Sequence, residues 1–403
     1  MDTTRPEPFF LPADAALLRV PPPAPYVYRS GAKRAAAGLL DFAGDLVLAR
    51  RPFPVDWARV ERAAVLRLDH LGDLINALPA LRRLRKALPK AALDLWVGPW
   101  GLELAGLFRD VDAVRVAEAP WFGRPRREAW PWASIAALGE GLRAGNYGAA
   151  FELRGELRHL LALRRSGIRV RAGLALTAGR FLLTHPARWN PALHEQEQNL
   201  SLLDQAGLPT AAADGAPYLH LDAAALREAA AVSRSLKLGR APVLVQAACG
   251  TNAKRWSPEA WAAVLRGLPA GAPLALLGSA AEAPEMRAIA ARVRRPVAVA
   301  AGRLSLAALA ALLGRARLLL SVDSGPAHLA AVQGAPVLAL FSGTNDPRRW
   351  APRGRRVRIL RAPDFPCSPC ELTDCPYGNA CMRAIGPRDV LAAARRMLKE
   401  GKP

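Results

Sequence analysis

The sequence predicts an α/β protein built from two Rossmann-like domains. The chain has 403 residues, too many for one ordinary core, and 51 % of them are hydrophobic, which excludes wholesale disorder. Apolar segments of strand length alternate with segments of helical periodicity, a pattern typical of a parallel sheet covered by helices. Two such series are separated at about residues 207–241, where Pro209, Gly215 and Pro217 interrupt regular structure.

Four regions are expected along the chain. Residues 1–60 form a Pro-rich extension in which residues 35–49 are predicted to be an amphipathic helix, either packed on the protein or lying on a membrane surface. A first domain is expected at 61–215 and a second at 216–385. Residues 386–403 are expected to form a C-terminal helix, with a return to the first domain as one possibility.

In the first domain, strands are predicted at residues 63–68, 93–97, 149–153 and 168–173. Leucines recur every three or four residues over 74–88, which indicates a helix. The loop between the first strand and this helix ends at Asp73. An Asp at that place is either a helix cap or a general base, and both interpretations stay open.

In the second domain, strands are predicted at residues 242–247, 274–277, 297–300, 318–322 and 337–341. Ser257 and Pro258 favour the start of a helix over 258–268. The last helix is predicted at 387–398.

A diphosphate site is predicted where the strand 318–322 meets the next helix. Asp323 ends the strand, Ser324 and Gly325 make a tight turn, and a Pro occupies the first helical position. The free N–H groups and the positive end of the helix dipole suit an anion, and His328 is placed to donate to a phosphate oxygen.

Lys254 and Arg255, in another loop after a strand, either neutralise phosphate charge or form a solvated basic loop.

Two further segments stand out. Residues 121–132 hold three Trp and three Arg. Trp121 with Arg124, Arg126 and Arg127 is expected to bind a phosphorylated glycolipid or to enter a membrane interface, unless Trp121 packs inside the domain. A Cys-rich segment at 367–381 holds four cysteines spaced C-x2-C-x4-C-x5-C. They either bind a structural zinc or an iron–sulfur cluster or remain free thiols; they are Cys367, Cys370, Cys375 and Cys381.

The formal charge is +22, and 49 of the 56 basic residues are Arg. Such a balance indicates either a polyanionic partner or a composition bias. The first twenty residues lack the apolar region of a signal peptide, and no run is long enough to span a bilayer. We therefore expect a cytoplasmic protein.

Several ordered motifs resemble glycosyltransferase family 9, which contains the ADP-heptose:lipopolysaccharide heptosyltransferases. The matching segments are residues 66–73 (LRLDHLGD), 194–199 (HEQEQN), 254–259 (KRWSPE), 321–331 (SVDSGPAHLAA) and 343–347 (GTNDP). Two departures are visible: Asp69-His70 stands where small hydroxyl residues are common, and 246–250 lacks the usual Pro-Gly pair.

The resemblance implies a GT-B fold, in which two Rossmann-like domains face a central cleft and the C-terminal domain binds the sugar nucleotide. It implies inversion at the anomeric carbon without a catalytic metal. Asp73 inherits the role of base, Lys254 and Arg255 assist the leaving diphosphate, and Glu282 contacts the ribose. The diphosphate site falls to Asp323, Ser324, Gly325 and His328.

The predicted function is transfer of a heptose or related sugar, with ADP-heptose as the expected donor, to a lipopolysaccharide-core or other cell-surface glycan. The expected partners are a nucleotide sugar, a phosphorylated glycolipid or glycan, and the inner-membrane surface, with no nucleic acid and no cofactor required for catalysis. Two alternatives stay open: a GT-B enzyme using a different nucleotide sugar, and a non-catalytic basic protein that binds RNA or membranes.

Overall fold

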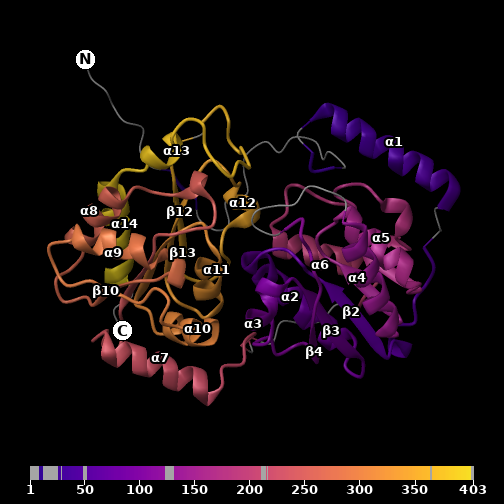
Figure 1. Ribbon diagram of the computed structural model, residues 1–403, viewed down its shortest axis with the longest axis horizontal. Helices are drawn as coiled ribbons and strands as arrows, with labels where there is room; N and C mark the ends of the chain where they lie inside the picture. Colours follow the sequence, from indigo (N-terminus) through magenta and orange to yellow (C-terminus); the bar gives the residue numbers. More distant parts are fainter. Residues whose placement is uncertain are drawn as a thin grey trace. The chain divides into compact units, whose positions relative to one another are not determined.

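The computed structural model describes residues 9–11, 26–28, 30–48, 52–122, 131–209, 215, 217–363 and 365–400. The chain divides into two compact units, Arg19–His220 and Leu221–Pro403, and the short strand β1 (Phe9–Leu11) pairs within the second. Each unit holds one sheet covered by helices (Figure 1). The predicted α/β class is therefore confirmed.

The first unit contains a parallel six-stranded sheet with the order β4-β3-β2-β5-β6-β7. Its strands are β2 (Arg62–Leu66), β3 (Ala92–Val97), β4 (Ala113–Val116), β5 (Ala149–Glu152), β6 (Val170–Gly173) and β7 (His185–Pro186). Along the chain, β2, β3 and β4 follow one another toward one edge of the sheet, and β5, β6 and β7 follow one another toward the other edge, so the strand order reverses between β2 and β5. Ligands of open α/β sheets bind beyond the strand ends at such a reversal.

The helices of the first unit are α1 (Gly31–Leu48), α2 (Leu71–Ala87), α3 (Leu102–Ala105), α4 (Trp132–Ala144), α5 (Leu157–Ser166) and α6 (Glu195–Gln205). Helix α2 begins three residues earlier than predicted. His70 is its N-cap residue, and the Asp73 side chain accepts the His70 backbone N–H at 3.2 Å. This capping box moves Asp73 from the expected helix start into the first turn.

The second unit contains a seven-stranded sheet with the order β1-β13-β12-β11-β8-β9-β10, in which β1 alone is antiparallel. Its other strands are β8 (Val243–Gln246), β9 (Leu274–Leu276), β10 (Ala298–Val299), β11 (Leu318–Val322), β12 (Val337–Phe341) and β13 (Val357–Arg361). Strand order reverses between β8 and β11. The two units therefore repeat one winding pattern, and each offers one ligand position.

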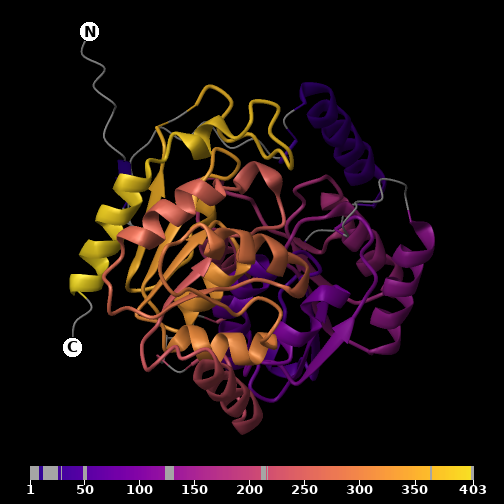
Figure 2. The ribbon, with the colours of Figure 1, turned by 60° about the vertical axis from the view of Figure 1, so that its left-hand side comes forward.

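The helices of the second unit are α7 (Ala223–Ser235), α8 (Pro258–Gly267), α9 (Ala283–Ala291), α10 (Leu306–Gly314), α11 (Gly325–Val332), α12 (Pro347–Trp350), α13 (Ala380–Arg383) and α14 (Pro387–Glu400). Helix α14 packs beside α8 along the outer side of this unit (Figure 2). Its residues Val390 and Ala394 are fully buried in the same core as Trp261. The C-terminal helix thus completes the core of the second unit.

Candidate functional site

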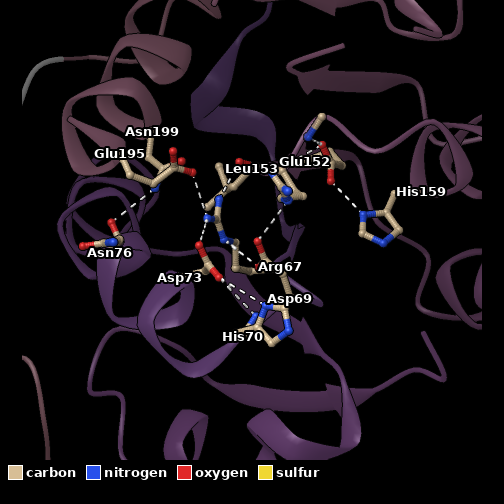
Figure 3. A network of polar contacts seen from close by, with 12 residues as sticks. Arg67, Asp69, His70, Asp73, Asn76, Glu152, Leu153, His159, Glu195 and Asn199 are labelled. Carbon is tan, nitrogen blue, oxygen red and sulfur yellow. Dashed lines mark hydrogen bonds and ion pairs between the residues drawn. The ribbon is translucent and has the colours of Figure 1, made fainter. Parts of the chain in front are cut away.

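A buried guanidinium organises the reversal point of the first sheet (Figure 3). The Arg67 side chain, with no exposed surface, donates from Nη1 to the Leu153 carbonyl at 2.6 Å. Its Nε lies 2.9 Å from Asp69 Oδ1, and its Nη2 lies 2.8 Å from Glu195 Oε1 and 3.2 Å from Asp73 Oδ1. Three carboxylates and one carbonyl thus compensate a charge that is costly to bury alone.

The topology explains why these groups meet. Arg67 and Asp69 directly follow β2, Arg154 directly follows the neighbouring β5, and Glu195 begins α6. Arg154 adds a second cation, since its Nε lies 3.3 Å from Asp69 Oδ2. The network therefore joins the ends of both strands at the reversal with the first turns of two helices.

Asp73 is the most accessible carboxylate of this network. Its side chain is 15 % exposed, whereas that of Asp69 is 2 % exposed. Burial raises the pKa of Asp73, but the hydrogen bond from His70 and the charges of Arg67 and Arg154 outweigh it and hold the pKa below its usual range. Asp73 is therefore ionised at neutral pH, the state that a proton acceptor needs, although a low pKa weakens it as a base.

Asp69 differs from Asp73 because burial dominates its environment. Burial raises the pKa of Asp69 from 3.8 to about 6, against the opposing charges of Arg67 and Arg154. The repulsion between Asp69 and Asp73 acts in the same direction as burial. Two carboxylates four residues apart thus have pKa values pushed in opposite directions, a pattern typical of functional sites.

The stability of the protein should depend on pH through Asp69. Because its pKa is higher in the folded chain, its stabilising contribution is fully present below about pH 4 and is lost as the pH rises through about 6. We expect the free energy of unfolding of the wild type, relative to Asp69→Asn, to fall by about 2 kcal/mol between pH 4 and pH 7. Urea unfolding of both proteins across this range measures the difference; a difference that stays constant or rises with pH would contradict the assignment.

A second buried network lies beside the first and contains Trp121. The indole Nε1 donates to His159 Nε2 at 3.3 Å, and His159 Nδ1 lies 2.8 Å from Glu152 Oε1. Since an indole N–H is only a donor, His159 Nε2 accepts and Nδ1 carries the proton shared with Glu152. Trp121 is 4 % exposed, so its burial favours the packing role that the sequence left open. Arg124, Arg126 and Arg127 lie outside the described residues.

The reversal point of the second sheet brings together two of the predicted donor-site residues. Lys254, in the short helix η4 (Asn252–Lys254) after β8, places its Nζ 2.6 Å from Asp323 Oδ2. Asp323 directly follows β11 and is 6 % exposed. Asn345, in the loop after β12, donates to the same oxygen at 2.7 Å. The sequence motif contained Asn345, but only the fold shows that it shares a partner with Lys254.

Helix α11 starts at Gly325, two residues after Asp323 and one residue before the predicted first helical position. Ser324 is its N-cap residue but makes no side-chain cap, because its hydroxyl lies 2.9 Å from that of Ser321 instead. Pro occupies the first turn, and His328 is buried one turn into the helix. The N-terminal end of this eight-residue helix thus lies next to the Lys254–Asp323 pair, and the two features together suit an anion.

Glu282 and Arg255 are held by other contacts. Glu282 Oε2 accepts the Ser279 backbone N–H at 2.8 Å and lies 3.0 Å from the Ser279 hydroxyl, in a capping box after β9. Arg255 lies 3.5 Å from Glu285. Neither contact joins them to Asp323, so their predicted donor-site roles stay predictions.

The four cysteines of the predicted metal site line one cavity of about 300 Å³, together with Phe365 and Tyr377. They do not form a ligand set. Within the described part of the chain, no cluster of three or more His, Cys, Asp or Glu residues is arranged to hold a metal ion. Cys381 instead accepts the Gly343 backbone N–H at 3.1 Å, and Cys367 is exposed while Cys370 is buried. The structure does not support the predicted zinc or iron–sulfur cluster at Cys367, Cys370, Cys375 and Cys381, because sequence spacing brings thiols near one another without directing them to one point.

Comparison with known proteins gives consistent results. The family model of glycosyltransferase family 9 (heptosyltransferase) matches residues 135–381. Lipopolysaccharide heptosyltransferase 1 of Pseudomonas aeruginosa is 29 % identical over 340 residues, which cover 78 % of this chain and 88 % of that protein.

Two solved structures have the same fold. A family 9 glycosyltransferase from Veillonella parvula superposes with a TM-score of 0.70 at 20 % identity, covering 84 % of this chain and 97 % of its own. The ADP-heptose lipopolysaccharide heptosyltransferase II of E. coli superposes with a TM-score of 0.67 at 20 % identity, covering 84 % and 99 %.

Proposed function

Because the chain belongs to glycosyltransferase family 9, the heptosyltransferase family, and is a glycosyltransferase with the GT-B fold, we propose that it transfers heptose from ADP-heptose to a lipopolysaccharide-core acceptor. The observation that carries this proposal is the Lys254–Asp323–Asn345 cluster beside the start of α11, at the reversal point of the second sheet. ADP-heptose is named for the similar protein from E. coli, and lipopolysaccharide is named for those from E. coli and P. aeruginosa.

In this proposal the second unit binds the sugar nucleotide. The N-terminal N–H groups of α11 and the Lys254 ammonium face the diphosphate, and His328 adds a donor from the first helical turns. Asn345 and Lys254 hold the Asp323 carboxylate, which limits its repulsion of the phosphates. Glu282 and Arg255 are proposed to complete this site at the ribose and the leaving group.

The chemical step is proposed as one displacement without a catalytic metal. The ionised Asp73 carboxylate accepts the proton of the acceptor hydroxyl as its oxygen attacks the anomeric carbon, which inverts that carbon. The bond to the nucleoside diphosphate breaks, and Lys254 and the helix end stabilise the negative charge that develops on the leaving group. Arg67 and Arg154 keep Asp73 ionised beforehand.

The acceptor is proposed to be a phosphorylated glycolipid of the cytoplasmic leaflet of the inner membrane. Arg124, Arg126 and Arg127 are proposed to supply phosphate contacts, and the buried Trp121 is proposed to support this side of the unit by packing. These arginines follow Trp121 by three to six residues in the sequence.

A thermal-shift panel of nucleotide sugars tests the donor site. At about 100 times its dissociation constant, ADP-heptose should raise the melting temperature of the wild type by about 5–10 °C. Asp323→Ala should lose most of this shift, because Lys254 and Asn345 lose their common partner. Glu259→Ala, which removes an exposed carboxylate paired with Arg292 in the same unit, should keep it. No response of the wild type to any nucleotide sugar would reject the transferase proposal.

A further inference from the structure

Helix α1 presents an apolar face that nothing in the described part of the chain covers. Leu39, Phe42, Leu46 and Val47 are 69, 70, 80 and 77 % exposed, and Leu40 and Leu48 are about half-exposed. Leu39, Phe42 and Leu46 are spaced by three and four residues and so lie on one side of the helix. A contiguous stripe of this kind marks an interaction surface, unlike single exposed apolar residues.

The opposite face fixes α1 to its unit. The Asp41 side chain, 4 % exposed, accepts the backbone N–H groups of Gly179 and Arg180 at 2.7 and 3.0 Å, and the Tyr26 hydroxyl donates to its other oxygen at 2.8 Å. Asp45 pairs with the Arg180 guanidinium. These contacts set the rotation of the helix about its axis, so the apolar stripe points away from the unit.

Figures 1 and 2 agree that α1 lies at the edge of its unit. It is 18 residues long, which corresponds to about 27 Å. None of the described helices combines the length and apolar character needed to cross a bilayer. A helix of this size with one apolar side and one docked side is suited to lying along a surface.

Charge identifies that surface. Both acidic side chains of α1 are used in docking, and the remaining charged residues, Lys33 and Arg34, are exposed cations at its N-terminal end. The whole chain carries +22. A net positive charge opposes self-association and favours an anionic partner, so an anionic lipid surface is the occupant that charge complementarity indicates.

We propose that α1 binds an anionic lipid bilayer, with Leu39, Phe42 and Leu46 inserted at the boundary between headgroups and acyl chains. The docked Asp41 then holds the first unit, which carries Asp73, against the membrane. This inference rests on the proposed function, in which the acceptor is anchored in the membrane. Binding to vesicles can be measured without the sugar donor and without the acceptor.

Co-sedimentation of the full chain with vesicles tests the proposal. Vesicles of phosphatidylcholine and phosphatidylglycerol at 3:1 should bind the wild type, and pure phosphatidylcholine should bind it much more weakly. The triple variant Leu39→Gln, Phe42→Gln, Leu46→Gln should bind the anionic vesicles at least about tenfold more weakly, because three inserted apolar side chains are lost. A matched control, Leu102→Gln with Leu226→Gln and Leu372→Gln, removes three scattered exposed leucines and should bind like the wild type.

Three results would overturn the proposal: no binding of the wild type to anionic vesicles, equal binding by the triple variant, or a wild-type dimer in solution that the triple variant abolishes. If the glutamine variant does not fold, the same three positions changed to Ala answer the question, since Ala has the highest helix propensity. Sugar transfer to a water-soluble, deacylated acceptor should be unchanged in the triple variant. If the wild type does not transfer sugar to this acceptor, that result contradicts the proposed function, while the vesicle result still tests membrane binding.

Discussion

Asp73→Asn is expected to lower kcat by about a thousandfold while leaving the affinity for ADP within about twofold. The amide keeps the size of the side chain and can still accept the His70 N–H, but it cannot take the proton of the acceptor hydroxyl. The proposed ADP site is the Lys254–Asp323 pair in the second unit, so ADP affinity is not expected to depend on Asp73. Steady-state kinetics with a soluble acceptor and calorimetry with ADP measure the two effects separately.

A matched control tests whether the loss is chemical. Asp56→Asn removes another carboxylate that accepts a backbone N–H at a helix start, that of Ala58 at 3.2 Å, and it should keep full activity. Asp69→Asn should keep kcat within about tenfold, because Asp69 is buried and too enclosed to reach an acceptor. If Asp69→Asn lost as much activity as Asp73→Asn, or if Asp73→Asn kept activity, the base would have to be reassigned.

Much of the fold could be predicted because parallel strands covered on both faces are continuous apolar runs. Every residue of β11 and β12 is buried, and both strands were predicted with correct bounds. Strands β4 and β13 were missed; β4 is the edge strand of its sheet, β13 lies next to an edge strand, and both have partly exposed residues, so neither is a continuous buried apolar run. Edge position is a property of strand order, which local periodicity does not contain.

The same distinction separates the predicted from the unpredicted site residues. Asp73, Lys254 and Asp323 follow strands, and the carboxyl ends of parallel strands are where ligands bind, so local sequence made them candidates, while the family resemblance supplied their predicted roles. Glu195 meets Arg67 across 128 residues, and Arg154 meets Asp69 only because β5 lies next to β2. An arginine inside an apolar strand, as in residues 63–68, was the one local signal that a buried ionic network was present.

Arg67→Met is expected to lower the stability of the first unit by about 3–5 kcal/mol, the largest effect on folding predicted for a single substitution in this protein. Replacing a whole buried ionic cluster with apolar residues can leave stability unchanged, whereas removing one member leaves buried charges uncompensated and lowers it strongly. Methionine fills the space of the arginine stem but leaves Asp69, Asp73 and Glu195 close together with Arg154 as their nearest remaining cation. Arg59→Met is the control: this side chain is 88 % exposed, pairs with the exposed Asp56, and should change stability by less than about 0.5 kcal/mol.

The two units need not unfold together, so the readout must be specific to one of them. Hydrogen exchange at β2 and β5 reports the first unit, while the thermal shift caused by ADP reports the second and should survive in Arg67→Met. Adding Glu195→Gln to Arg67→Met removes one unpaired carboxylate and should recover part of the lost stability, whereas Glu195→Gln alone removes a partner of Arg67 and should be destabilising. Glu195→Gln should therefore stabilise the Arg67→Met variant and destabilise the wild type, and this is expected only if Arg67 stabilises the fold by compensating buried carboxylates. If the two substitutions had strictly additive effects on the free energy of unfolding, Arg67 would act through packing.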